Sequence, residues 1–246
     1  MRDLNQYTDT YKNADFEDIM VHYRRQIILD SLNKYCTDRS SIIEIGCGLD
    51  SIANHYQNFK TLTVLEPAKA FYDKCVNDIK NYNNASNILP INATAEEFDC
   101  EEKFDFIIIS GLLHEVAKPA EILQSIKKLC TTDTVIHINV PNALSFHRLL
   151  ALEMGLIERL HQKSDTQIRL QQHHTFDKDL LEELVTSCNF HILESESYFI
   201  KPFTHKQMKA LLDSDLFDVS LLDGLMRLTK YFPNNGCELY MNVAIN

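Results

Sequence analysis

The chain has 246 residues, of which 45% are hydrophobic, so it can bury one substantial core or a core with an appended subdomain. Its formal net charge is −11, and it contains no dense run of Lys and Arg. Because such a surface repels a phosphate backbone, we expect no nucleic-acid partner. The polar N-terminus lacks the apolar segment of a signal peptide, and no uncharged apolar stretch approaches the roughly 18 residues of a membrane span.

The seven cysteines are odd in number and widely spaced, and no Cys-x-x-Cys pair occurs. This pattern argues against a zinc site and against a disulfide framework. Reduced thiols are the simpler interpretation, and they predict a cytoplasmic protein.

A helix is predicted over residues 14–36, where apolar side chains recur at helical spacing. From about residue 41 to 141, short apolar strands then alternate with helices. Continuously apolar strands indicate burial on both faces, which is typical of a parallel sheet with helices on each side and ligands beyond the carboxyl ends of its strands. The expected strands are 40–47, 62–67, 87–94, 104–110 and 133–141, and the expected helices are 51–59, 68–82 and 119–130, with a short helical turn at 95–98.

The rest of the chain follows a different pattern. We expect its inserted helices to lie as a cap over the carboxyl edge of the sheet, where a substrate would be enclosed. Asp177 is the expected N-cap of one of the helices, and Pro119 lies near the first turn of an earlier one. The expected elements are one or two helices within 143–170, a helix over 176–188, a strand over 190–201, helices within 205–231 and a last strand over 238–245.

The segment EIGCGLDS ends the first strand with Gly46 and Gly48, two of only six glycines in the chain. Glycines there let the backbone turn tightly and let a ligand approach it closely. The dinucleotide fingerprint Gly-x-Gly-x-x-Gly is broken at Ser51. The alternative pattern, an acidic residue followed by Gly-x-Gly-x-Gly, begins at Glu44 and has Asp50 in place of its last glycine. Asp50 or Ser51 is the expected N-cap of the helix that follows.

Further strand ends carry polar side chains. Glu66 ends the second strand, where a carboxylate can accept hydrogen bonds from both hydroxyls of a ribose. Asn92 and Ala93 end the third strand, where a side-chain amide can reach an adenine edge. The fourth strand ends at Ser110.

Taken in order, these motifs resemble those of the class I S-adenosylmethionine-dependent methyltransferases, over about residues 38–246. Glu44 and the two glycines are similar to the family's glycine motif, and Glu66 is similar to its ribose-binding acid. Asn92-Ala93 lies where the family often has Asp-Ala. The stretches FDFIIISGLLHEV and ELYMNVAI are similar to its fourth-strand motif and to its late antiparallel strand.

The resemblance implies an α/β fold with a doubly wound, seven-stranded, mostly parallel Rossmann-like sheet and an inserted helical cap. It implies S-adenosyl-L-methionine as the cofactor and S-adenosyl-L-homocysteine as the product. The expected parts are an N-terminal helical extension at 1–40, a cofactor-binding core at 41–142, a helical cap at 143–176, and the C-terminal part of the core sheet at 177–246 with a helical insertion at about 204–231. The implied cofactor-binding residues are Glu44, Gly46, Cys47 through its backbone, Gly48, Glu66, Pro67, Asn92, Ala93 and Ser110.

Two positions depart from the family pattern. Asn92 replaces the usual acid but keeps an acceptor for the adenine. Asp50 replaces a glycine, and two alternatives stay open for it. It either caps the helix, or it faces the cofactor, where it would repel the carboxylate but could meet the sulfonium or the amino group.

Methyl transfer to a hydroxyl requires a positioned nucleophile and the removal of a proton. His114 follows the fourth strand, which borders the methyl group in this fold, and His173 precedes the helix after the cap. These two histidines are the predicted catalytic residues. Metal-dependent members of the family place carboxylates after the fourth and fifth strands, where this chain has Ser110 and Asn142, so no catalytic metal is expected.

A second resemblance, over about residues 138–246, is to a subgroup associated with cell-surface glycan and lipopolysaccharide biosynthesis. It is carried by VPNALSFHRLLALEMGLIE, the His-x-x-Phe stretch from His173 to Phe176, SYFIKPFTHKQM and YFPNNGCELY. It implies methylation of a sugar or sugar-linked group on oxygen. The implied acceptor residues are Asn142, His147, Arg148, His174 and Lys201, with Arg148 and Lys201 available for a phosphate or a carboxylate.

The leading hypothesis is therefore an O-methyltransferase acting on a small polar metabolite, such as a sugar or a nucleotide-linked sugar. Alternatives keep the cofactor and change the acceptor to an amine, a quinone-like ring or a phosphorus-linked group. Another alternative is a catalytically silent partner subunit. A nicotinamide dehydrogenase is disfavoured because Gly-x-Gly-x-x-Gly fails. The N-terminal helix either covers the active site or mediates a homodimer, and the sequence leaves both open.

Overall fold

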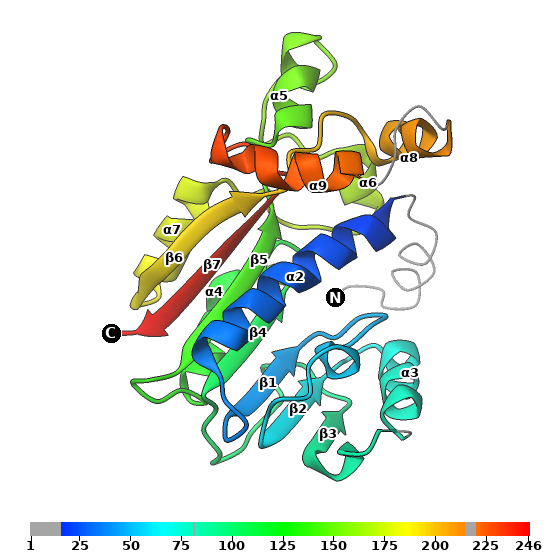
Figure 1. Cartoon of the computed structure of the whole chain (residues 1–246). Helices are drawn as coiled ribbons and strands as arrows, with labels where there is room; N and C mark the ends of the chain where they lie inside the picture. Colours follow the sequence, from blue (N-terminus) through cyan, green and yellow to red (C-terminus); the bar gives the residue numbers. More distant parts are fainter. Residues whose placement is uncertain (1–15, 81, 215–219) are drawn as a thin grey trace.

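The structure is a computed structural model that describes residues 16–80, 82–214 and 220–246 (Figure 1). Within these residues, seven strands form one sheet in the order β3-β2-β1-β4-β5-β7-β6. Neighbouring strands are parallel except that β7 runs antiparallel to both β5 and β6. The predicted fold class is therefore confirmed. The strands are β1 (Ser41–Ile45), β2 (Thr61–Leu65), β3 (Ile88–Ile91), β4 (Phe106–Ser110), β5 (Val135–Pro141), β6 (Phe190–Tyr198) and β7 (Glu238–Ile245).

Helices cover both faces of this sheet (Figure 1). Local signals explain several helix ends, because Pro119 occupies the first turn of α4 and the Asp177 side chain accepts from the Leu180 amide to cap α7, as expected. The helices are α2 (Glu17–Tyr35), α3 (Lys69–Ile79), α4 (Pro119–Lys127), α5 (Phe146–Glu153), α6 (Asp165–Arg169), α7 (Lys178–Ser187), α8 (His205–Asp213) and α9 (Ser220–Arg227), with short 3-10 helices η1 (Ile52–Asn54), η2 (Ala85–Asn87) and η3 (Leu228–Lys230).

Alternate side chains of the strands build two apolar layers. On β4, Ile107 and Ile109 pack with α4 and α7 on one face, while Phe106 and Ile108 pack with α2 and α3 on the other. This alternation is what a strand buried on both faces requires. The carboxyl ends of the parallel strands then meet at a single edge, so the residues that follow β1, β2, β4 and β5 lie close together.

Two predicted helices are corrected. Only η1 forms between β1 and β2, so the helix expected over 51–59 is wrong, and residues 95–98 form a turn without a helix. For the segment 51–59, the physical reason is that α2 already covers this face of the sheet. Ile28 and Leu32 of α2 join the same apolar cluster as β1 and β4, and α2 crosses the front of the sheet in Figure 1.

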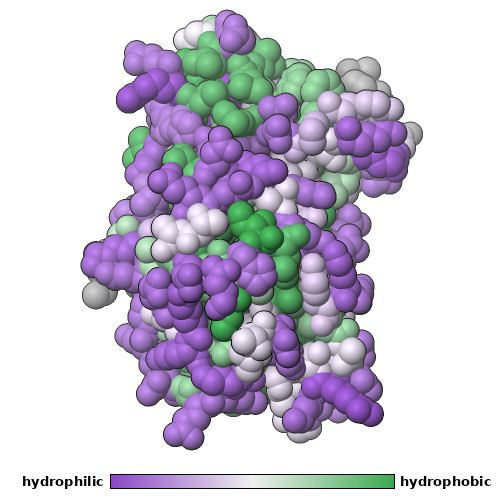
Figure 2. All heavy atoms as spheres, turned by 90° about the vertical axis from the view of Figure 1, so that its left-hand side faces the viewer, coloured by the Kyte–Doolittle hydropathy of each residue, from purple (hydrophilic) through white to green (hydrophobic). Residues whose placement is uncertain are grey.

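The remaining helices α5, α6, α8 and α9 lie at the carboxyl edge (Figure 1). Residues 143–170 hold two helices, where one or two were expected, and 205–231 hold α8, α9 and η3, apart from 215–219, which lie outside the described residues. Beyond α5, the side chains of Met154 and Leu156 are 62% and 69% exposed. Figure 2 shows hydrophobic side chains gathered at the top of the molecule, the end at which α5 lies in Figure 1. None of the described helices combines the length and the apolar character needed to cross a membrane.

The α2 face also buries polar side chains. His137 of β5 is fully buried between the rings of Phe106 and Tyr240, and its Nδ1 forms a hydrogen bond of 2.8 Å with Asn242 Oδ1. Asn242 Nδ2 in turn donates to Ser31 Oγ of α2 at 3.0 Å. Burial, only partly offset by the hydrogen bond with Asn242, lowers the pKa of His137 to about 4. His137 is therefore a neutral structural residue at pH 7.

This burial predicts an acid-sensitive stability. The unfolded chain binds a proton at His137 below about pH 6.5 whereas the folded chain does not, so stability falls as the pH is lowered from about 6.5 to about 4, by about 3 kcal/mol. We expect denaturant unfolding of the variant His137→Gln to lose this part of the pH dependence, while His191→Gln, at an exposed position, keeps it. Equal slopes for the wild type and His137→Gln would contradict the assignment.

Candidate functional site

The turn after β1 leaves one side of its backbone open. Gly46 and Gly48 have φ angles of 81° and 56°, in the left-handed region that favours glycine. No atom lies within 4 Å of the position that a Cβ would take at either residue. A ligand can therefore contact this backbone directly, and a side chain here would occupy its place.

Glu66 lies directly beside this turn. Its Oε2 accepts from the Gly48 amide at 3.0 Å, its Oε1 accepts from the Ala68 amide at 2.8 Å, and it is only 5% exposed. Burial raises the pKa of Glu66, while the two amide hydrogen bonds act in the opposite direction. The carboxylate is therefore fixed beside the open glycine turn, and its binding of a ribose stays a prediction.

Glu44 is held by the start of η1. Its carboxylate accepts hydrogen bonds from the Ser51 hydroxyl and from the Ile52 amide, the latter at 3.1 Å and 3.2 Å to its two oxygens. Burial raises the pKa of Glu44 to about 7, although the hydrogen bonds from Ser51 and Ile52 favour the charged form. Glu44 thus orders the loop and titrates near neutral pH.

Asp50 is not the N-cap. Ser51 caps η1 through its side chain, which accepts from the Ala53 amide. The Asp50 carboxylate instead accepts from Arg25 of α2, from Asn54 and from His55. Burial by itself raises the pKa of Asp50, but these hydrogen bonds and the charge of Arg25 outweigh it and hold the pKa below its usual value.

The other predicted cofactor residues surround the same turn. Asn92 Nδ2 donates to the carbonyls of Glu66 and Pro67 at 2.7 Å and 3.1 Å, so its amide shapes the loop after β2. Cys47 is buried, with its Sγ 3.8 Å from Glu66 Oε2. A hydrogen bond with Cys75 and burial raise the pKa of the Cys47 thiol, so it stays protonated and is no nucleophile.

A chain of hydrogen bonds runs from the end of β4 across the sheet edge to α2. Ser110 Oγ donates to Asn139 Oδ1 at 2.8 Å, and Asn139 Nδ2 donates to the Tyr198 hydroxyl at 3.1 Å. The Tyr198 hydroxyl donates to Glu238, which also accepts two hydrogen bonds from Arg24, one of 2.9 Å from Nε. The four neighbouring strands β4, β5, β7 and β6 thus each contribute one polar side chain to a single network.

Sequence reasoning missed Arg24 and Glu238 as parts of this network. The two residues are 214 positions apart in the sequence, so no local spacing indicates that they pair. Burial by itself raises the pKa of Glu238, but the charge and hydrogen bonds of Arg24 outweigh it and keep the carboxyl ionised. The Nη2 atom of Arg24 also lies 3.3 Å from Oε1 of Glu17. Burial raises the pKa of the Glu17 carboxyl.

The predicted catalytic histidines are brought together through the backbone. The carbonyl of His114 accepts from the amides of His173 and His174 at 2.9 Å and 3.0 Å. The imidazole of His114 is buried, with its Nε2 3.8 Å from Glu115 Oε1. The side chain of His173 is exposed, and His174 Nε2 lies 3.1 Å from the Ala117 carbonyl. The segment after the cap therefore lies against the loop after β4.

Two predicted acceptor residues have contacts within the chain. Asn142 Nδ2 donates to the carbonyls of Asn234 and Gly236, and the guanidinium of Arg148 donates to the carbonyls of Leu160 and Gln162. Acceptor binding by Asn142 and Arg148 stays a prediction, and both would have to give up these carbonyls to make it. His147 and Lys201 lie at the same edge without such contacts.

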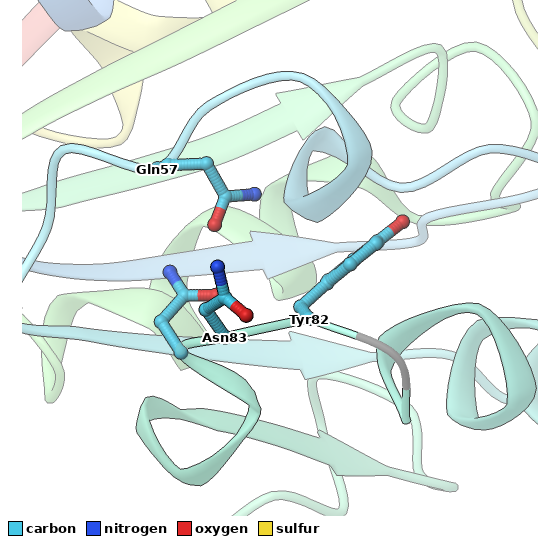
Figure 3. A pocket seen from close by; sticks show the side chains of 4 residues that line it. Gln57, Tyr82 and Asn83 are labelled. Carbon is cyan, nitrogen blue, oxygen red and sulfur yellow. The ribbon is translucent and has the colours of Figure 1, made fainter.

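Other features of the surface lie away from this edge. A hollow of about 500 Å³ is lined by Gln57, Tyr82, Asn83 and Asn84, which belong to the loops that enter β2 and β3 at the amino end of the sheet (Figure 3). It contains no carboxylate, imidazole or amine. Among residues 16–80, 82–214 and 220–246, no three His, Cys, Asp or Glu side chains lie together as metal ligands would.

Comparison with solved structures supports the same fold. A protein assigned as a sarcosine dimethylglycine methyltransferase from Galdieria sulphuraria matches with a TM-score of 0.63 at 12% identity, over 95% of this chain and 89% of the other. The N-methyltransferase NodS from Bradyrhizobium japonicum WM9, solved with S-adenosyl-L-homocysteine, matches with 0.58 at 12% identity, over 98% of each chain. The plantazolicin methyltransferase BamL, also solved with that product, matches with 0.58 at 16% identity, over 94% of this chain and 88% of the other.

No curated protein matches the chain in sequence. The family described as Methyltransferase domain does match, over residues 20–195, which is more than half of the chain. The open glycine turn and the adjoining Glu66 carboxylate fit the nucleoside of the cofactor that this family uses. The chain therefore belongs to the methyltransferase domain family and is an S-adenosylmethionine-dependent methyltransferase.

Proposed function

We propose that the protein methylates an oxygen of a small polar acceptor, a sugar or sugar-nucleotide-related metabolite of surface-glycan biosynthesis. The observation that carries the oxygen assignment is the buried pair of His114 and Glu115 at the end of β4. A hydroxyl must lose its proton as it is methylated, and an imidazole close to a carboxylate is suited to accept it. The resemblance of residues 138–246 to the glycan subgroup supports the acceptor class.

In this proposal, the chain's own residues hold the cofactor at the carboxyl edge. Glu66 accepts from the ribose hydroxyls, Asn92 lies at the adenine and Glu44 lies near the methionine amino group, with Ser110 bordering the methyl position. When bound, S-adenosylmethionine supplies an electrophilic methyl group on a sulfonium centre that is already a good leaving group. The protein therefore has to orient the acceptor and move one proton.

We further propose that residues 41–142 bind the cofactor and that the helices within 143–176 and 204–231 enclose the acceptor. His114 and His173 are the proposed catalytic residues. The predicted homodimer is retained as a proposal, to be checked by the mass of the protein in solution.

An amine acceptor is the second candidate. NodS, whose structure is similar, is by its name an N-methyltransferase. A buried carboxylate such as Glu115 would suit an amine that binds as a cation and loses a proton before it is methylated. A panel of sugars, nucleotide sugars and amines, followed by release of S-adenosyl-L-homocysteine, separates the two. Turnover confined to amines would overturn the oxygen assignment, and turnover confined to hydroxyl acceptors would exclude the amine candidate.

The first prediction concerns the ribose contact. We expect Glu66→Ala to weaken the binding of S-adenosyl-L-homocysteine by about 1–2 kcal/mol, the scale of hydrogen bonds lost to a charged acceptor. Isothermal titration calorimetry measures this loss. Glu96→Ala removes an exposed acid near the same edge and serves as the control. An unchanged affinity of Glu66→Ala would remove Glu66 from the ribose site.

The second prediction uses the pKa of Glu44. Because this pKa is raised to about 7, the carboxyl is largely protonated at pH 6 and ionised at pH 8, and only the ionised form attracts the cationic amino group. We expect the affinity for S-adenosylmethionine to rise about tenfold between pH 6 and pH 8. Titrations at both pH values measure it, with Glu44→Gln as the comparison. The assignment fails if Glu44→Gln shows the same pH dependence as the wild type.

The third prediction concerns the proton. We expect His114→Ala to lower turnover about 100-fold, as the loss of a general base does, with little change in the affinity for S-adenosyl-L-homocysteine. His173→Ala tests the second histidine, and His191→Ala, at an exposed position, is the control. Should both active-site variants keep wild-type turnover, neither histidine accepts the proton.

A further inference from the structure

Among the described residues, eight buried side-chain polar atoms lack a hydrogen-bond partner, and four of them lie in one segment of the chain. These four are Ser145 Oγ, His147 Nδ1, Gln172 Oε1 and Thr175 Oγ1. All four belong to the connection between β5 and α7, which contains α5 and α6. Folded interiors leave few such atoms unbonded, so four of them within about 30 residues of sequence need a physical explanation.

The backbone places three of these residues close to the carboxyl edge. Ser145 is the N-cap of α5, yet its side chain makes no capping hydrogen bond, and His147 lies in the first turn of the same helix. Ala143 donates to the Phe176 carbonyl at 2.7 Å, which brings Thr175 alongside the start of α5. Polar groups from both ends of the cap connection therefore lie beside the strand ends.

Lys201 reaches this place from another element. It follows β6, is only 6% exposed, and its ammonium forms no hydrogen bond or ion pair with any described residue. An ammonium group carries three donors, and burying it without an acceptor is costly. The Phe146 amide donates to the Asn235 carbonyl at 3.0 Å and the Cys237 amide donates to the Phe199 carbonyl at 2.8 Å, so one short segment joins the start of α5, with His147, to the end of β6, with Lys201. In keeping with this placement, burial lowers the pKa of Lys201, and burial together with the charge of Lys201 lowers the pKa of His147, which is neutral at pH 7.

The acidic groups around Lys201 are already engaged. Glu238 accepts from Arg24 and Tyr198, and Glu17 contacts Arg24. Cys237 and the two carboxylates act to raise the pKa of Lys201, but burial outweighs them and the pKa stays below its usual value. The positive charge of Lys201 thus remains available to a ligand, and a neutral imidazole and hydroxyl groups beside it can donate further hydrogen bonds.

We propose that Lys201 and His147 form a subsite that binds an anionic group, a carboxylate or a phosphate, on the methyl acceptor. The subsite rests on the proposed function in that the anion is taken to belong to the acceptor. Lys201 contributes the charge, and His147 Nδ1, with the hydroxyls of Ser145 and Thr175, contributes directional hydrogen bonds. Acceptors that carry such a group would then be preferred over neutral analogues of the same shape.

Small anions test the subsite without knowledge of the acceptor. Inorganic phosphate and acetate are titrated separately at constant ionic strength, with and without saturating S-adenosyl-L-homocysteine, and Kd is obtained from the shift in the unfolding midpoint. We expect Lys201→Met to weaken the binding of the preferred anion at least about tenfold and Lys201→Arg to retain it. Lys206→Met, at an exposed position, is the matched control and should bind as the wild type does.

The two anions distinguish the two chemical sources. Stronger binding of phosphate assigns a phosphorylated acceptor, and stronger binding of acetate assigns a carboxylate acceptor. Loss of affinity in His147→Leu, with the fold checked by circular dichroism, supports the second member of the subsite. If S-adenosyl-L-homocysteine fails to bind while the anion still depends on Lys201, the proposed function fails and the subsite stands. Equal anion affinities of the wild type, Lys201→Met and Lys206→Met overturn the subsite.

Discussion

The central strand β4 cannot tolerate solvent on either face, and much of the structure follows from this constraint. Four of its five residues, Phe106, Ile107, Ile108 and Ile109, are fully buried, so helices must cover both sides of the sheet. On one face, α4 and α7 do so in the expected way. On the other face, the link between β1 and β2 provides only η1, and α2 provides the cover together with α3. The N-terminal helix is therefore part of the core.

The position of α2 has a consequence for the site. Two consecutive residues of this helix bind carboxylates on different parts of the carboxyl edge: Arg25 binds Asp50 of the cofactor loop, and Arg24 binds Glu238 of β7. The same helix thus contacts the region proposed for the cofactor and the region proposed for the acceptor. Asp50, which takes the place of a family glycine, has its partner on α2.

Local sequence patterns predict the strands, most helices and the cofactor edge, because these depend on neighbours in the chain. The apolar runs of β1 and β4 and the Asp177 cap are local features. The absent helix after β1 depends on which element covers the sheet face, and residues 51–59 carry no signal of that competition. Asp50 shows the same limit, since its partner lies 25 residues earlier on another element. The network from Ser110 to Arg24 depends on sheet order as well.

The two hydrogen bonds that Glu66 accepts from the Gly48 and Ala68 amides have an entropic meaning. A carboxylate on a free side chain must be immobilised when it meets a ribose, and that loss of rotamer freedom subtracts from the affinity. Here the loss has already occurred during folding. The glycine turn and the acid are held in one arrangement, so in the proposed cofactor site the energy of the ribose contact would be expressed more fully as binding.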